Sequence, residues 1–146
     1  EKLLAAPGIE FASLGGQDTA TLWREIRDVA LLHPERFLWR VSVPPSAASE
    51  LVDWTASLTS ERLFDWAGGL IWLAPKETWA REALTIREAL VGRGGHATLM
   101  RAPTWLRQEV PPFEPQPHAL HTLTERVKRS FDPKGVLNPG RMYAGI

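Results

Sequence analysis

Residues 37–43 read FLWRVSV, and this stretch decides how the rest of the chain is arranged. Successive side chains of a strand point to opposite faces, so the stretch divides into two sets. One face carries Phe37, Trp39, Val41 and Val43, and the other carries Leu38, Arg40 and Ser42. The alternation predicts a β-strand, which the two prolines that follow it end.

The segments after this strand predict a definite order of helices and strands. They indicate a helix over 46–58, strands over 63–66 and 70–74, a helix over 77–91 and a strand over 96–101. A Gly-Gly pair at 68–69 supplies the turn between the middle strands. The order βαββαβ predicts an α+β domain of the ferredoxin-like class, an antiparallel sheet of four strands with two helices on one face. The other face carries either the Trp39 set or the Arg40 set, and it meets water, a ligand or another domain.

A helix is predicted on each side of this unit. The first runs from Asp18 or Thr19 to His33, where a proline ends it. Between the sheet unit and the last helix, residues 103–117 contain five prolines, so we expect no regular structure there. We interpret residues 1–17 as the remnant of a preceding strand or linker, which leaves 18–146 as the domain proper.

The last helix is predicted from Pro117 to the residue before Pro133. Its apolar stripe consists of Leu120, Leu123, Val127 and Phe131. His118 and His121 lie opposite this stripe, with Glu125 one turn further on. That spacing suits a metal in principle, but residues opposite an apolar stripe are usually solvated. We therefore predict no metal site.

The composition excludes several classes of function. The chain has 146 residues, with 17 lysines and arginines against 17 acidic residues, and a pI near 7.2. This balance argues against nucleic-acid binding, and no segment has the aromatic signature of an RNA-recognition sheet. The absence of cysteine excludes disulfides, zinc–thiolate sites and iron–sulfur clusters held by this chain. Its apolar runs are too short to span a membrane, so we expect no direct membrane insertion.

Arg40 and His96 are the candidate catalytic residues. Arg40 lies among apolar neighbours in the middle of its strand, so it is either a salt-bridged structural arginine or an anion-binding group. His96 follows two glycines at a strand start, where it is either hydrogen-bonded locally or in contact with a substrate.

The C-terminal sequence FDPKGVLNPGRMY, residues 131–143, packs two prolines and two glycines into an irregular segment. Its backbone path is largely preset, because proline fixes φ and glycine permits close approach. Free chain ends usually fray, so we expect something to hold this segment in place.

This tail closely resembles the end of flavoproteins in the FAD-linked oxidase group, which bind FAD in the vanillyl-alcohol-oxidase manner. Internal segments narrow the resemblance to the C-terminal part of the FAD-binding subunit of bacterial glycolate oxidases. The resemblance extends over about residues 20–146. The segments that carry it are WREIRD (23–28), WRVSVPP (39–45), DWAGGLIWL (65–73) and GGHATL (94–99).

The resemblance implies roles for the tail and for the sheet. Beside the flavin would lie the N-P-G-R residues Asn138, Pro139, Gly140 and Arg141. Many relatives have lysine in place of this arginine. The sheet would cover the isoalloxazine ring and shape a substrate pocket, with Arg40, Trp66 and His96 as its candidate residues. FAD would be bound mainly by a preceding domain that is absent from these residues.

The resemblance also implies a function, the C-terminal substrate or cap domain of glycolate oxidase. The complete enzyme would oxidise glycolate to glyoxylate and pass electrons through FAD to an iron–sulfur subunit. The implied partners are that subunit, a sister flavin subunit and a small 2-hydroxy acid, in the cytoplasm or at the inner face of the membrane. The isolated chain would be inactive. Two alternatives stay open: a non-catalytic module that docks the sister flavin subunit, and the cap of a dehydrogenase for another 2-hydroxy acid such as D-lactate.

Overall fold

The computed structural model describes most of the chain, namely residues 13–34, 36–58, 61–75 and 80–146. Most of the remnant predicted over 1–17 and the first residues of the helix predicted over 77–91 lie outside the described residues.

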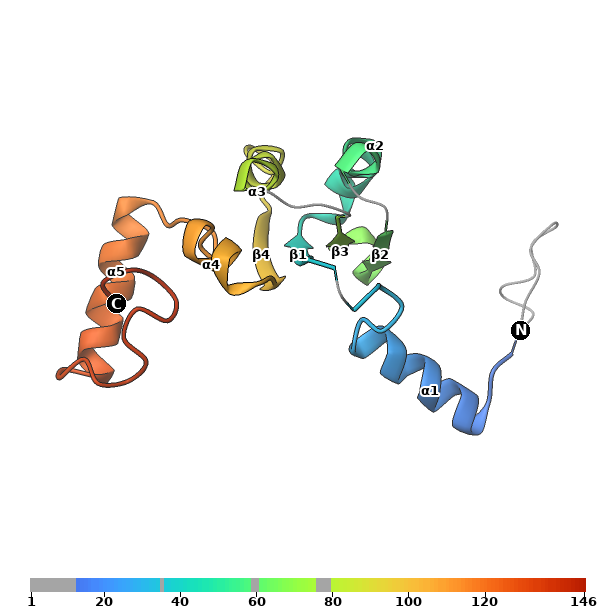
Figure 1. Ribbon diagram of the computed structural model, residues 1–146, viewed down its shortest axis with the longest axis horizontal. Helices are drawn as coiled ribbons and strands as arrows, with labels where there is room; N and C mark the ends of the chain where they lie inside the picture. The colour runs from blue at the N-terminus through green and yellow to red at the C-terminus, as the bar shows by residue number, and fades with distance from the viewer. Residues whose placement is uncertain (1–12, 35, 59–60, 76–79) are drawn as a thin grey trace. The chain divides into compact units, whose positions relative to one another are not determined.

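The chain divides between Leu31 and Leu32 into two compact units, and each is described by itself. The first contains helix α1, Gly16–Arg27 (Figure 1). This helix ends well before the predicted His33. The reason is Val29, whose φ of 54° lies in the left-handed region that a right-handed helix cannot include.

The second unit contains the predicted βαββαβ order. Its elements are β1 (Leu38–Ser42), η1 (Pro45–Ala47), α2 (Ala48–Leu58), β2 (Glu61–Asp65), η2 (Trp66–Gly68), β3 (Leu70–Ala74), α3 (Ala80–Glu88), β4 (His96–Arg101), α4 (Thr104–Glu109) and α5 (His118–Phe131). The sheet order is β2-β3-β1-β4, and all neighbouring strands are antiparallel. Each of α2 and α3 thus joins two parallel strands with a third strand between them, so the ferredoxin-like prediction is confirmed. Among the described helices, none has both the length and the apolar character needed to cross a membrane.

The two strand faces follow the predicted alternation. Trp39 and Val41 are buried in one apolar core with Leu51 of α2 and Ile86 of α3. Figure 1 shows α2 and α3 on the same side of the sheet. The Trp39 set therefore faces the helices, and the set that contains Arg40 faces the other way.

The structure corrects two local predictions. Residues 104–109 form the short helix α4, although no regular structure was expected over 103–117. The prolines of this region flank the helix without entering it, because Pro103 is its N-cap and the next proline is Pro111. The predicted strand 63–66 is instead 61–65, since Trp66 begins a turn.

Arg87 of α3 holds the segment that follows α4. Its Nη2 donates to the carbonyl oxygens of Pro111 at 2.5 Å and Phe113 at 3.0 Å, and its Nε lies 3.5 Å from a Glu114 carboxylate oxygen. The guanidinium also lies over Trp39, 5.5 Å from the ring centroid. Burial lowers the pKa of Arg87, and the charge of Glu114 opposes that shift. One buried side chain thus ties a helix, the core and an irregular segment together.

The segment that Arg87 holds covers the outer edge of β4. The backbone N–H of Leu99 donates to the carbonyl of Pro112 at 2.8 Å, and that of Ala97 donates to the carboxylate of Glu114 at 3.2 Å. Unpaired N–H groups on an edge strand otherwise invite pairing with another chain. The chain itself therefore closes this edge of the sheet.

We expect Arg87→Met to lower the free energy of unfolding by about 2–4 kcal/mol, because two carbonyls and Glu114 lose a buried charged donor. Urea unfolding measures this. Arg107→Met is the matched control: Arg107 also donates to two carbonyls, those of Met100 and Ala102, but it is exposed. Its loss should cost less than about 1 kcal/mol, and equal losses in the two variants would contradict the prediction.

Candidate functional site

The sheet face opposite the helices, here called the Arg40 face, brings side chains from four strands into two rows. Residues directly opposite each other in neighbouring strands point to the same face. The first row consists of Leu63, Trp72, Arg40 and Thr98. The second row consists of Asp65, Leu70, Ser42 and His96. The structure thus places the two candidate catalytic residues, Arg40 and His96, in adjacent rows of one face.

Arg40 is a half-buried cation on this face. Within the described part of the chain, its guanidinium has neither a hydrogen-bond nor an ion-pair partner, so the salt-bridged alternative is not found there. Its Cζ lies 5.6 Å from the centroid of the Trp66 ring. A guanidinium has five N–H donors in one plane, and a carboxylate accepts two of them at once. Its donors are therefore available to an anion from outside the described chain.

Trp66 reaches Arg40 from the turn between β2 and β3. The sequence predicts this turn at Gly68 and Gly69, but only the first of these glycines has a positive φ, of 92°. Trp66 and Ala67 instead adopt φ values of 52° each. The turn therefore leaves the indole 61% exposed, in cation–π contact with Arg40.

His96 is exposed at the start of β4, directly opposite Ser42. It lines a depression of about 450 Å³ together with Thr98, Phe113 and Tyr143. The imidazole is therefore accessible to a ligand that approaches the Arg40 face from the β4 side.

Part of the N-P-G-R motif lies beside β4. Gly140 and Arg141 line a depression of about 710 Å³ with Thr98, whose sheet partner is Arg40. The structure thus brings Arg141, an exposed cation, to the border of the Arg40 face. It does not bring Asn138 there within the contacts described; that residue is exposed, with a left-handed φ of 47°.

Asp132 organises the loop that leads to this motif. Its carboxylate accepts hydrogen bonds from the N–H groups of Val136 at 3.0 Å and Leu137 at 2.8 Å, and it lies 2.9 Å from Lys128 Nζ. Lys128 Nζ also donates to the Leu137 carbonyl. The hydrogen bond from Lys128, followed by that from the Leu137 N–H, lowers the pKa of Asp132 to about 2. The loop is thus held by contacts within the tail and with the last turn of α5.

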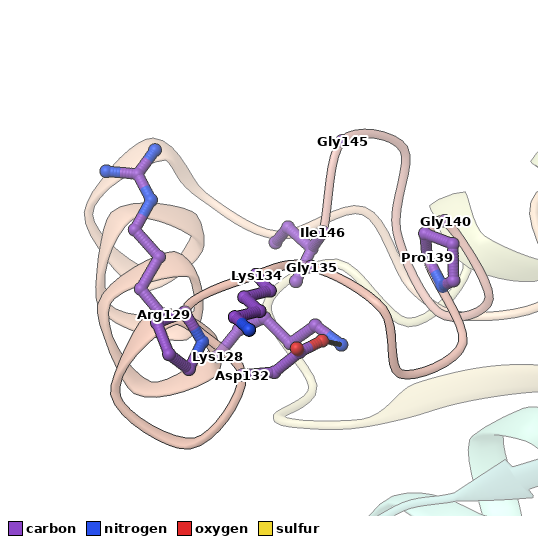
Figure 2. Close-up of a pocket in the computed structure, with 10 residues that line it drawn as sticks. Lys128, Arg129, Asp132, Lys134, Gly135, Pro139, Gly140, Gly145 and Ile146 are labelled. Carbon is purple, nitrogen blue, oxygen red and sulfur yellow. Dashed lines mark ion pairs between the residues drawn. The ribbon is translucent and has the colours of Figure 1, made fainter.

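This loop encloses an open depression of about 490 Å³ (Figure 2). Figure 2 shows Lys128 and Asp132 together with Lys134 on one side, and Pro139 and Gly140 on the other, whereas Arg129 points away. The ion pair with Asp132 neutralises much of the positive charge on this side.

The amino-acid sequence matches that of a curated protein over most of its length. It is 36% identical over 136 residues to glycolate oxidase subunit GlcE of Escherichia coli strain K12. The predicted resemblance to this subunit of bacterial glycolate oxidases is confirmed. The match covers 91% of this chain but 34% of the relative, so the chain spans about a third of the length of that protein. No family model matches the chain, and no solved structure matches it.

The chemistry of the Arg40 face and the positions of the glycines can be compared with what a flavin dinucleotide needs. A dinucleotide pyrophosphate is usually held by glycine-rich turns that open a helix. Gly92 and Gly94, both with positive φ, follow α3 and precede a strand, whereas Gly15 and Gly16 stand at the start of α1. The Arg40 face offers aromatic rings and a cation on a sheet, which suit one side of a planar ring.

Several residues of the Arg40 face and of the loop beside it are not predicted from the sequence. Trp72 and Thr98 flank Arg40, but their position depends on strand register, which a single sequence does not give. Asp132 lies in the segment predicted to be held in place, and its position between a helix end and a proline is a sequence signal for a capping role.

We expect the N–H resonances of Val136 and Leu137 to titrate with a midpoint near the pKa of Asp132, about 2. Because this pKa is depressed from 3.8, the stabilisation of the loop is complete above about pH 4 and is lost as pH falls through about 2. Two-dimensional NMR between pH 6 and pH 1.5 measures the midpoint. The titration should vanish in Asp132→Asn, and a midpoint at the ordinary value would contradict the prediction.

Proposed function

We propose that this chain is the C-terminal cap of an FAD-linked glycolate oxidase subunit, and that its Arg40 face closes one side of the substrate site. The observation that carries this proposal is a half-buried Arg40 that has no acidic partner among the described residues. Partial burial of a cation without an acidic partner costs free energy unless a bound anion compensates its charge. The similarity to glycolate oxidase subunit GlcE supports the same conclusion.

In the proposed complex, Arg40 binds the carboxylate of glycolate through two N–H groups and so orients the α-carbon. His96, in the adjacent row, is the group on this face that accepts the hydroxyl proton. Bound FAD supplies the redox chemistry that converts glycolate to glyoxylate. Asn138, Pro139, Gly140 and Arg141 lie beside the flavin in this proposal.

The proposed assembly contains further subunits. Electrons pass from the flavin to an iron–sulfur subunit, since this chain has no cysteine to hold a cluster. A sister flavin subunit completes the complex, which we place in the cytoplasm or at the inner face of the membrane. The isolated chain is expected to be inactive, because it supplies one wall of the site.

A second candidate function, assembly without catalysis, is favoured by α5. The apolar stripe of this helix is exposed rather than packed: Leu120 47%, Leu123 53%, Val127 51% and Phe131 83%. Exposed apolar stripes on soluble proteins commonly mark contact surfaces. In this proposal the stripe docks the sister flavin subunit.

Arg40→Ala in the assembled oxidase tests the first proposal. We expect the KM for glycolate to rise about 10–100-fold, the loss that follows removal of a charged hydrogen-bond donor. Steady-state kinetics with glycolate, and with D-lactate in parallel, measure the effect on each substrate. The control is Arg93→Ala, which removes an arginine already paired with Glu50 at 3.1 Å. An unchanged KM in Arg40→Ala would refute the proposed role.

Val127→Asp tests the second candidate. A charge in the middle of the exposed stripe should release this chain from the sister subunit without unfolding it, because Val127 is half exposed. Co-purification and size-exclusion chromatography measure assembly. Arg126→Asp, next to the stripe on an exposed position, is the control. Intact assembly in Val127→Asp would exclude this stripe as the docking surface.

A further inference from the structure

We infer that Trp66 is a positioning residue, whose indole fixes the guanidinium of Arg40 so that its N–H edge faces a small carboxylate. This inference rests on the proposed function, because it takes Arg40 as the group that binds the substrate carboxylate. It assigns a role to the turn between β2 and β3, which the proposed function leaves unexplained.

The turn adopts an unfavourable backbone conformation. Trp66, Ala67 and Gly68 are consecutive and have φ values of 52°, 52° and 92°. A bulky residue in the left-handed region is a true outlier, and such strain persists only where surrounding contacts enforce it.

Specific contacts hold the turn in this conformation. The Asp65 carboxylate accepts a hydrogen bond from the Trp66 N–H at 2.7 Å, and the Gly69 N–H donates to the Trp66 carbonyl at 2.9 Å. Gly68 packs so closely that a Cβ there would lie 2.8 Å from the Cβ of Ala48. The start of α2 therefore fixes the position of the turn, and the turn fixes the position of the indole.

The strain is not explained by burial of the indole. Trp66 is 61% exposed, so its conformation contributes little to the core. The contact that the turn does create is the cation–π contact with Arg40, at 5.6 Å. The unusual backbone conformation of Trp66 brings its indole to a candidate binding residue. Backbone strain with that result points to a role in binding.

The N–H donors of Arg40 have no hydrogen-bond acceptor among the described residues. A carboxylate binds a guanidinium in its plane, at the N–H edge, so an aromatic ring over the guanidinium face does not compete with it. Asp65 lies on the same sheet face, but its carboxylate accepts from the Trp66 N–H, and no described ion pair joins it to Arg40. The same turn therefore contacts the guanidinium of Arg40 and also occupies the Asp65 carboxylate with a hydrogen bond from the Trp66 N–H.

The variant that tests this inference is Trp66→Gly in the assembled oxidase, with glycolate as substrate and oxalate as a non-reacting carboxylate probe. Glycine removes the indole and also tolerates a positive φ, so the variant should unfold at the same Tm or higher. Its KM for glycolate and its Kd for oxalate should rise about 3–10-fold, with kcat nearly unchanged. A merely structural tryptophan would instead lower the Tm and leave the Kd unchanged.

Three further variants make the test specific. Trp66→Phe keeps an aromatic ring and should restore the oxalate Kd to within about twofold. Trp23→Gly removes a tryptophan of similar exposure, 64%, from α1 and should leave the Kd unchanged. In an Arg40→Lys background, which lacks the planar guanidinium, Trp66→Gly should add no further loss.

The outcomes separate this inference from the proposed function. If Arg40→Ala leaves the oxalate Kd unchanged, the proposed function and the inference both fail. If Arg40→Ala raises the Kd but Trp66→Gly does not, the inference alone fails. An equal effect of Trp66→Gly with and without the Arg40→Lys substitution would also overturn it, because the two residues would then act independently.

Discussion

The second unit of the chain depends on the buried guanidinium of Arg87. A ferredoxin-like sheet has two edges, and the β4 edge is completed here by an irregular segment that has no regular hydrogen bonding of its own. Arg87 supplies what that segment lacks: it donates to two of its carbonyls, approaches its glutamate and lies over the core tryptophan Trp39. A buried arginine is costly by itself, and here its partners offset that cost.

This constraint also positions the candidate site. The segment around Phe113 is fixed against β4, and the ring centroid of Tyr143 lies 6.0 Å from that of Phe113. This contact places the end of the tail beside β4. Arg141 thereby comes to the border of the face that carries Arg40. The core side of the sheet and the Arg40 face are thus connected through one strand edge.

Much of this fold could be predicted from the sequence, since strand alternation and proline positions are local signals. The stretch FLWRVSV predicts both faces of β1, and His96–Arg101 is the strand that the pattern indicates. Alternation divides β1 into two sets but does not by itself say which set the helices cover. Only the packing of α2 and α3 against Trp39 and Val41 decides that question.

The site was less predictable than the fold, for two physical reasons. The Arg40–Trp66 contact depends on a left-handed Trp-Ala pair, and propensity assigns such a conformation to the glycines instead. Arg87 resembles any exposed arginine of a helix until the segment at 111–114 covers it.

The loop organised by Asp132 has a kinetic consequence for any encounter that the tail makes. Its shape comes from contacts between Lys128 at the end of α5 and Asp132 and Leu137 of the tail, so the loop is formed before a partner arrives. A segment that must fold during association loses conformational entropy at that moment, and its binding is slowed or weakened accordingly. A preformed loop avoids this step. Its association rate is then set by diffusion and orientation, and the lifetime of the complex by how well the loop fits.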